Sequence, residues 1–177
     1  MFISEFVAKY NETKQKNAFL NKHIKTHYIN YETKISLAQN IVNISMYKEI
    51  NGKKTFIINS PIRYMLFVQA LIDYYTDLEW DKGVDENGNE VLDVSKGFNA
   101  LEQSGAVEAL IATIGDDVTK FTTVLNMVVD DEIDARRSIV PFIETKIEAA
   151  SIAFDTLSQA LESPEIKNKI VQMINKS

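Results

Sequence analysis

His23 and His27 are the only histidines of the chain, and their spacing is the first feature that could support chemistry. Side chains four residues apart lie on one face of a helix, where two imidazoles can bind a zinc ion. No Glu stands between them at the position that a metalloprotease motif requires, and His27 falls near an expected helix end. The pattern therefore favours a structural or surface role for both residues, with a zinc site as the alternative.

Four carboxylates lie close together in the last third of the chain: Asp130, Asp131, Glu132 and Asp134. Together with an acidic residue elsewhere, such as Asp116, they could bind a divalent metal through oxygen ligands, as phosphoryl-transfer sites do. Arg136 and Arg137 follow directly and can pair with the carboxylates. The favoured interpretation is a solvated, self-paired stretch of helix, and no metal ligand is assigned.

The remaining motifs of enzymes and metal proteins are missing from the sequence. Asp85, Asn87 and Asn89 alternate as in a calcium loop, but the glycine stands at the fourth position instead of the sixth. There is no glycine-rich phosphate loop, no cysteine and no serine in a nucleophile motif. We therefore expect no enzyme activity, no catalytic residues, and no bound cofactor or metal.

Length and composition indicate one globular helical domain over residues 1–177. Apolar residues make up 45% of the chain, and six Gly and three Pro are few for its length, which favours helices. The first residues lack a basic stretch followed by an apolar run, so no signal peptide is expected. No apolar stretch is long enough to cross a bilayer, so no membrane partner is expected.

The net charge of −6 is unevenly distributed. Residues 1–54 carry a charge of +5 and residues 55–177 a charge of −11. Lysines alone supply the positive charge of residues 1–54, and the absence of Arg from these residues argues against sequence-specific nucleic-acid binding. Non-specific phosphate contact is an alternative use of the lysines. The asymmetry suggests either complementary faces on neighbouring copies or a charge drift along one soluble surface.

The sequence from Ser60 to Trp80 predicts the central helix of the fold. Ser60 is a suitable N-cap, and Pro61 suits the first helical turn. Apolar residues then fall on every side, so this helix is expected to be covered all round.

Turn residues predict the elements around that helix. Asn51-Gly52 and Asn87-Gly88 each predict a small hairpin, because a type I′ turn needs positive φ at both positions. Residues 27–31 (HYINY) are rich in aromatic and β-branched types, which favours an extended segment. Further helices are expected to begin near Ser4, Lys16, Glu32 and Ser95, after the break at Ser104-Gly105, and at Asp116 and Ser163.

The most regular pattern lies in the last third of the chain. Apolar residues alternate there at spacings of three and four over three heptads: Val140, Ile143, Ile147, Ala150, Phe154, Leu157 and Leu161. Pro141 suits the first turn of a helix beginning nearby, whereas it would kink a helix that continues from Asp116. We call these seven residues the heptad stripe and regard them as the candidate interaction site. The stripe either faces the core of a bundle or forms an oligomer seam.

Several sequence segments, taken in their order along the chain, resemble those of a known group of proteins. The runs KHIKTHYINYETKISLAQNIV, NSPIRYMLFVQALIDYYTDLEW, FTTVLNMVVDDEID and LESPEI, within residues 22–166, resemble small proteins from the virion gene modules of tailed bacteriophages, particularly those of Gram-positive or gut bacteria. The resemblance implies a head, neck or tail component, or an assembly factor made beside one. It assigns no functional residue.

These observations predict a non-enzymatic structural protein of a phage particle, located in the virion or in the host cytoplasm. Its expected partners are itself or other virion proteins, such as those of the capsid or the head–tail connection. The alternatives are an assembly chaperone that is not retained in the particle and an acidic inhibitor of a host protein. The expected fold is mainly α: a helical bundle with a central buried helix, one or two hairpins and a long C-terminal helix.

Overall fold

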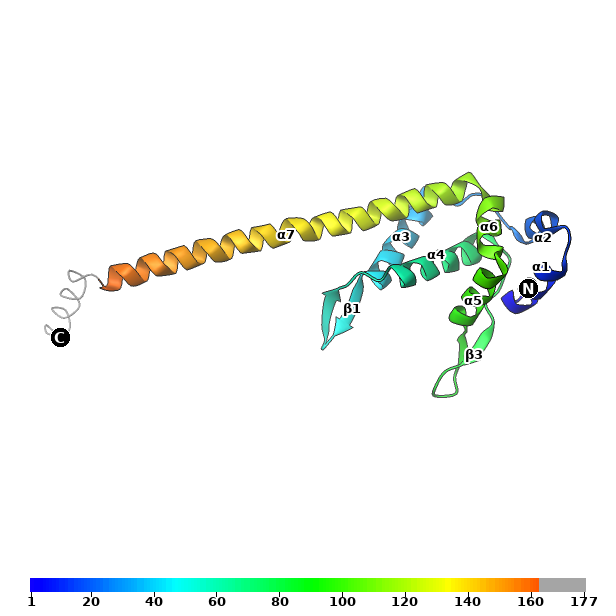
Figure 1. Cartoon of the computed structure of the whole chain (residues 1–177), viewed down its shortest axis with the longest axis horizontal. Coiled ribbons are helices and arrows are strands. Elements are labelled where there is room, and N and C mark those ends of the chain that lie inside the picture. Colours follow the sequence, from blue (N-terminus) through cyan, green and yellow to red (C-terminus); the bar gives the residue numbers. More distant parts are fainter. Residues whose placement is uncertain (163–177) are drawn as a thin grey trace. The chain divides into compact units, whose positions relative to one another are not determined.

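The computed structural model describes residues 1–162, apart from some side chains of the last helix: Ser138, Val140, Pro141, Glu144, Thr145 and residues 153–162. This part of the chain is mainly helical, with two small antiparallel hairpins, as expected (Figure 1). The helices are α1 (Ile3–Glu12), α2 (Lys16–His23), α3 (Tyr31–Ser45), α4 (Ser60–Tyr75), α5 (Val94–Ser104), α6 (Ala106–Ile114) and α7 (Asp116–Glu162). The strands are β1 (Tyr47–Ile50), β2 (Lys53–Phe56), β3 (Lys82–Val84) and β4 (Glu90–Leu92). The helix expected from Ser163 lies outside the described residues.

The chain separates into two compact units, Met1–Val129 and a second unit that begins at Asp130. The first unit contains α1 to α6, both hairpins and the beginning of α7, and the rest of α7 belongs to the second. The assignment of residues 1–177 to one domain stays a prediction.

α4 provides much of the core of the first unit. It packs against α3 and α5, and the ring of Phe67 stacks on that of Phe121 with a centroid distance of 5.4 Å. The second half of α4 is buried on several sides, but Ile62, Tyr64 and Tyr74 are exposed. The expectation that this helix is covered all round is therefore wrong for these three residues. Burial of apolar surface is the main favourable contribution to folding of the unit.

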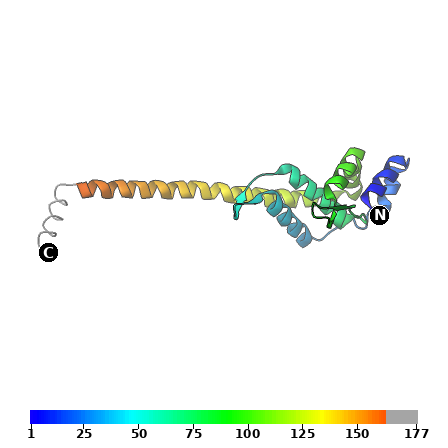
Figure 2. The same cartoon turned by 90° about the horizontal axis from the view of Figure 1, so that it is seen from below.

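The segment after α4 attaches the N-terminal helix to this core. The backbone N–H of Ile3 donates to the carbonyl of Glu79 at 3.0 Å, and the carboxylate of Asp81 accepts from the backbone and the hydroxyl of Ser4. Figures 1 and 2 show α1 and α2 beside α5 and α6, with which they are in contact. Ser4 thus bonds to a distant loop residue instead of capping α1.

Both predicted hairpins are present, and their turns differ. Asn51 and Gly52 have φ values of 51° and 71°, the positive pair that a two-residue type I′ turn requires. The β3–β4 hairpin has a longer loop, residues 85–89, in which Asp85 accepts hydrogen bonds from the backbone of Asn87 and Asn89. The carboxylate of Asp85 therefore stabilises this turn.

Helix ends follow the expected chemistry but lie one or two residues from the predicted positions. Asn59 caps α4 by accepting from Ile62, and Asp93 caps α5, where Ser60 and Ser95 were expected. Gly105 has φ of 67° and ends α5, as the predicted break requires. A helix beginning at Asp116 is also confirmed.

α7 continues through the residues where a second helix could have begun. Its backbone is helical from Asp116 to Glu162, so Pro141 is an interior proline of the helix. A proline has no N–H and cannot donate the usual bond to the carbonyl four residues earlier, that of Arg137. The heptad stripe consequently lies on a helix that begins in the first unit.

Candidate functional site

The heptad stripe lies entirely within the helical backbone of α7. Among its members with described side chains, Ile143 is 48% exposed and Ile147 is 64% exposed, and Ala150 is exposed as well. The side chains of Val140, Phe154, Leu157 and Leu161 lie outside the described part of the structure. The exposure of two isoleucines shows that this part of the stripe is not buried within the described chain.

The geometry of a helix determines which other residues border the stripe. At about 100° per residue, Ile139 falls near Ile143 and Ile147, whereas Ile152 falls on the opposite side of the helix. Ile139 and Ile152 are also exposed. The stripe is thus flanked by Ile139, and Ile152 offers an apolar position of the same type on the other face.

Two of the four acidic residues, Glu132 and Asp134, are paired within their own helix. Arg136 Nε lies 3.5 Å from Glu132 Oε1, and Arg137 Nη1 lies 3.8 Å from Asp134 Oδ1. Over the residues with described side chains, no group of three or more His, Asp or Glu is placed to hold a metal ion. Exposed pairs of this kind stabilise a helix only slightly.

The two histidines have separate partners. α2 ends at His23, whose Nδ1 is 2.9 Å from Asp77 Oδ1, while His27 Nδ1 lies 3.3 Å from the carbonyl of Ile114. The helix that would place both imidazoles on one face does not extend to His27. The structure therefore assigns each histidine a separate contact.

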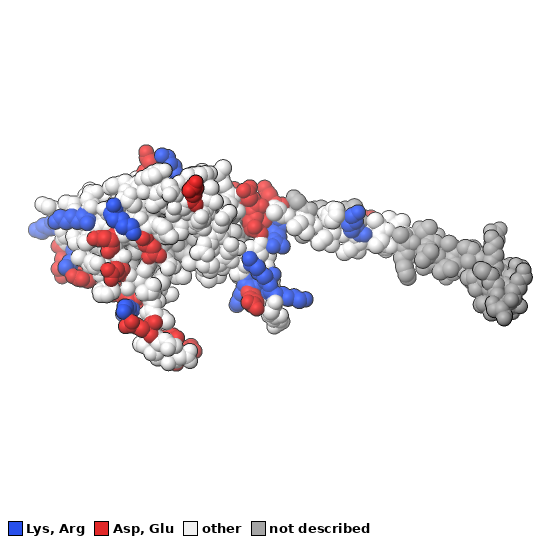
Figure 3. All heavy atoms as spheres, turned by 180° about the vertical axis from the view of Figure 1, so that it is seen from behind, with Lys and Arg blue, Asp and Glu red and all other residues white. Residues whose placement is uncertain are grey.

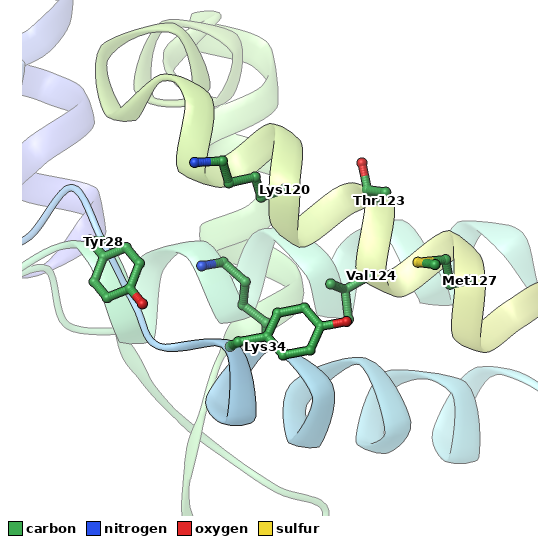
Figure 4. A pocket seen from close by; sticks show the side chains of 7 residues that line it. Tyr28, Lys34, Lys120, Thr123, Val124 and Met127 are labelled. Carbon is green, nitrogen blue, oxygen red and sulfur yellow. The ribbon is translucent and has the colours of Figure 1, made fainter.

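A pocket of about 420 Å³ lies between the N-terminal part of α3 and the first turns of α7, within the first unit. Its lining combines two tyrosines, two lysines, one threonine and two apolar residues: Tyr28, Tyr31, Lys34, Lys120, Thr123, Val124 and Met127. Figure 4 shows the ammonium groups of Lys34 and Lys120 directed toward the end where Tyr28 lies, with Val124 and Met127 toward the other end. The pocket therefore has a cationic end and an apolar end.

A buried hydrogen-bond network lies next to the pocket and includes Lys34, one of the residues that line it. Lys34 is 3% exposed, and its Nζ donates to Asp117 Oδ1 at 2.8 Å and to the carbonyl of Ile29 at 2.5 Å. Asp117 Oδ2 accepts from the backbone N–H of Ile29 at 3.0 Å and from the Tyr75 hydroxyl at 2.8 Å. Every polar atom of the carboxylate thus has a partner, as a buried charge requires.

The network changes the acidity of its members. Burial opposes ionisation of Asp117, but the hydrogen bonds from Lys34, Ile29 and Tyr75 outweigh that effect and hold the pKa of its carboxyl below the usual value. Burial and the bond to Asp117 raise the pKa of the Tyr75 hydroxyl well above its ordinary value. Asp117 is therefore the charged member that balances Lys34, and Tyr75 is the neutral donor.

Residues 27–30 lie outside the helices and strands, and Asn30 has the extended backbone angles that were expected (φ −67°, ψ 159°), whereas Tyr31 begins α3. The backbone of this segment makes its contacts with the network, since the N–H of Ile29 donates to Asp117 and its carbonyl accepts from Lys34. The same segment places Tyr28 over the cation, with Lys34 Nζ 4.8 Å from the ring centroid. The sequence predicted a helix beginning at Asp116, but it did not predict that Asp117 pairs with Lys34.

The lysines of the basic N-terminal part are spread among different contacts. Lys34 is buried, Lys16 Nζ lies 4.3 Å from the ring centroid of Tyr10, and Lys25 donates to the backbone of Asp73. Figure 3 shows positive side chains gathering over the β1–β2 hairpin, where Lys54 Nζ lies 4.2 Å from the ring centroid of Tyr47. These lysines do not form one continuous basic surface with Lys34.

Two further results bear on function. Within the described residues, no helix has both the length and the hydropathy that a membrane span demands. Comparisons of the chain with protein-family models, with curated proteins and with solved structures find no match.

Proposed function

We propose that this chain is a non-enzymatic structural protein that assembles with further copies of itself through the heptad stripe of α7. The observation that carries the proposal is the exposure of Ile143 and Ile147 on a stripe with heptad spacing. Apolar side chains at this spacing pair with the same pattern on another helix, because each a or d residue enters a hole between four residues opposite. A second copy presents an identical stripe and is therefore the occupant that the pattern fits best.

The expected setting is a phage particle, as a component of the head, neck or tail. Support comes from the resemblance of residues 22–166 to virion-module proteins and from the separation of the chain into two units. In this proposal, the helices of Met1–Val129 form a bundle around α4, and residues 140–161 form the assembling helix. The protein is present in the host cytoplasm before assembly and in the virion afterwards.

The decisive experiment measures the mass of the full chain by light scattering over a concentration series. We expect the wild type to form a discrete oligomer and the double variant Ile143→Lys/Ile147→Lys to have the mass of the 20.1 kDa monomer. Lysine at a seam position places a charge where a partner would bury it, which opposes association.

Ile152→Lys is the matched control, since it makes the same exchange at an exposed position on the opposite face. It should retain the wild-type mass. A wild type that stays monomeric at every concentration, or a control that dissociates as fully as the double variant, would exclude assembly through the stripe. Detection of the chain in purified particles tests the virion assignment, and its presence in lysate alone would indicate an assembly chaperone.

A further inference from the structure

The pocket beside Lys34 takes no part in the proposed assembly, because its lining residues belong to the first unit and the heptad stripe belongs to the second. Its volume of about 420 Å³ is within the usual range for small-molecule sites, about 300–1,000 Å³. Such sites combine an apolar lining with a few placed polar groups. The pocket has both, so its chemistry can be used to define a ligand.

The charge of the pocket indicates the charge of the ligand. Lys34 and Asp117 balance each other as a buried pair, so the pair contributes no net charge. Lys120 is exposed and has no ion-pair partner among the described residues. No acidic side chain is among the residues that line the pocket. One positive charge is therefore unbalanced, which favours a ligand with a single negative charge.

The arrangement of the lining indicates the shape of the ligand. The ammonium groups of Lys34 and Lys120 point toward the Tyr28 end, and Val124 and Met127 lie toward the other (Figure 4). A carboxylate at the first end would accept hydrogen bonds from lysine, which has three donors. Val124 and the flexible Met127 side chain offer apolar surface at the second end, and thioethers pack favourably on aromatic rings.

From this arrangement we propose that the pocket binds a small apolar monocarboxylate. Its carboxylate lies at the cationic end near Lys120, and its aromatic or branched aliphatic body lies against Val124 and Met127. Lys34 is a positioning residue: its bonds to Ile29 and Asp117 hold the segment that carries Tyr28. The proposal is independent of assembly through α7.

The test is isothermal titration of the full-length protein with 4-phenylbutyrate as the probe. A ligand of this size should bind with a Kd of about 1 mM or tighter. The matched amide, 4-phenylbutyramide, has the same body without the charge and should bind about fivefold more weakly, since a partly exposed ion pair contributes modestly. Lys120→Met should cause a similar loss for the carboxylate and no loss for the amide.

Two further variants keep the test interpretable. Lys96→Met removes an exposed lysine outside the pocket and should leave binding unchanged. Met127→Asp places a negative charge at the exposed apolar end and should weaken binding of the carboxylate and of the amide without unfolding the chain. All variants should keep the wild-type thermal midpoint and the wild-type mass.

Three outcomes would overturn the proposal: no saturable binding of 4-phenylbutyrate, equal binding of acid and amide, or an unchanged Kd in Lys120→Met. Binding of a peptide with a C-terminal phenylalanine, with no binding of the free acid, would also overturn it and indicate a protein partner. The mass measurement is a separate readout, so failure of this proposal and failure of the proposed assembly can be distinguished.

Discussion

Lys34 and Asp117 form a buried ion pair, 2.8 Å between Nζ and Oδ1, although 83 positions separate them in the chain. Both residues are at most 5% exposed. The pair joins α3 to the first turn of α7 and so fixes the two walls of the pocket. Four hydrogen bonds make up the network: the Lys34 ammonium group donates two, one of them to Asp117 Oδ1, and Asp117 Oδ2 accepts the other two, from Ile29 and Tyr75.

Lys34→Met should destabilise the protein strongly. The substitution leaves the Asp117 carboxylate buried without its counter-charge, a change that costs about 3–5 kcal/mol in comparable pairs. Urea unfolding measures the free energy, with Lys96→Met as an exposed control that should differ from wild type by less than about 0.5 kcal/mol. The double variant Lys34→Met/Asp117→Asn should regain part of the loss, because it removes the unpaired charge. Equal stability of wild type and Lys34→Met would contradict a structural role for the pair.

The contribution of Asp117 to stability should disappear in acid. Its pKa is lowered in the folded chain, so its ionised form contributes stability above the unfolded pKa, near 3.8, and loses it as the pH falls through the folded pKa. The difference in unfolding free energy between wild type and Asp117→Asn should therefore be constant at neutral pH and shrink below about pH 4. Asp131→Asn, at an exposed position, should show only a small difference throughout. A difference for Asp117→Asn that grows on acidification would refute the assignment.

Gly97→Ala should destabilise α5 despite the better helix propensity of alanine. A Cβ at this position would lie 2.9 Å from Cε3 of Trp80, closer than packed atoms allow. The overlap should cost about 1–3 kcal/mol, more than the gain of about 1 kcal/mol for replacing a helical glycine. Thermal unfolding of Gly97→Ala and of Asn99→Ala, an exposed site in the same helix, compares the two effects. Only the first variant should have a lower midpoint.

The oligomer proposed for α7 should persist in salt. Apolar contacts through Ile143 and Ile147 are not screened, whereas contacts between exposed charges weaken as the Debye length falls to about 3 Å at 1 M. Light-scattering mass at about 0.05 M and about 1 M NaCl should therefore agree. Dissociation of the oligomer at the higher NaCl concentration would contradict this. It would indicate that copies associate through charge, between the basic residues 1–54 of one copy and the acidic residues 55–177 of the next.

Local patterns predicted the elements whose geometry depends on a few adjacent residues. Asn51 and Gly52 form the expected turn because their positive φ values are intrinsic to those residue types. Gly105 ends α5 for the same reason. Cap positions differed by one or two residues, since Asn59 and Asp93 compete with the neighbouring serines for the same backbone donors.

Long-range contacts decided what local patterns could not. The HYINY segment has residues that favour a strand, but Ile29 bonds to Asp117 and no strand pairs with it. Composition alone identified Lys34 as one of several basic residues, and its burial depends on an acceptor 83 positions away. The sequence by itself determined most of the helix positions, the Asn51-Gly52 turn and the heptad spacing of α7, because these follow from local backbone preference and periodicity. Only the tertiary structure decided that Lys34 is buried, that a pocket forms beside it, and that Ile143 and Ile147 are exposed, because each depends on which distant residues meet.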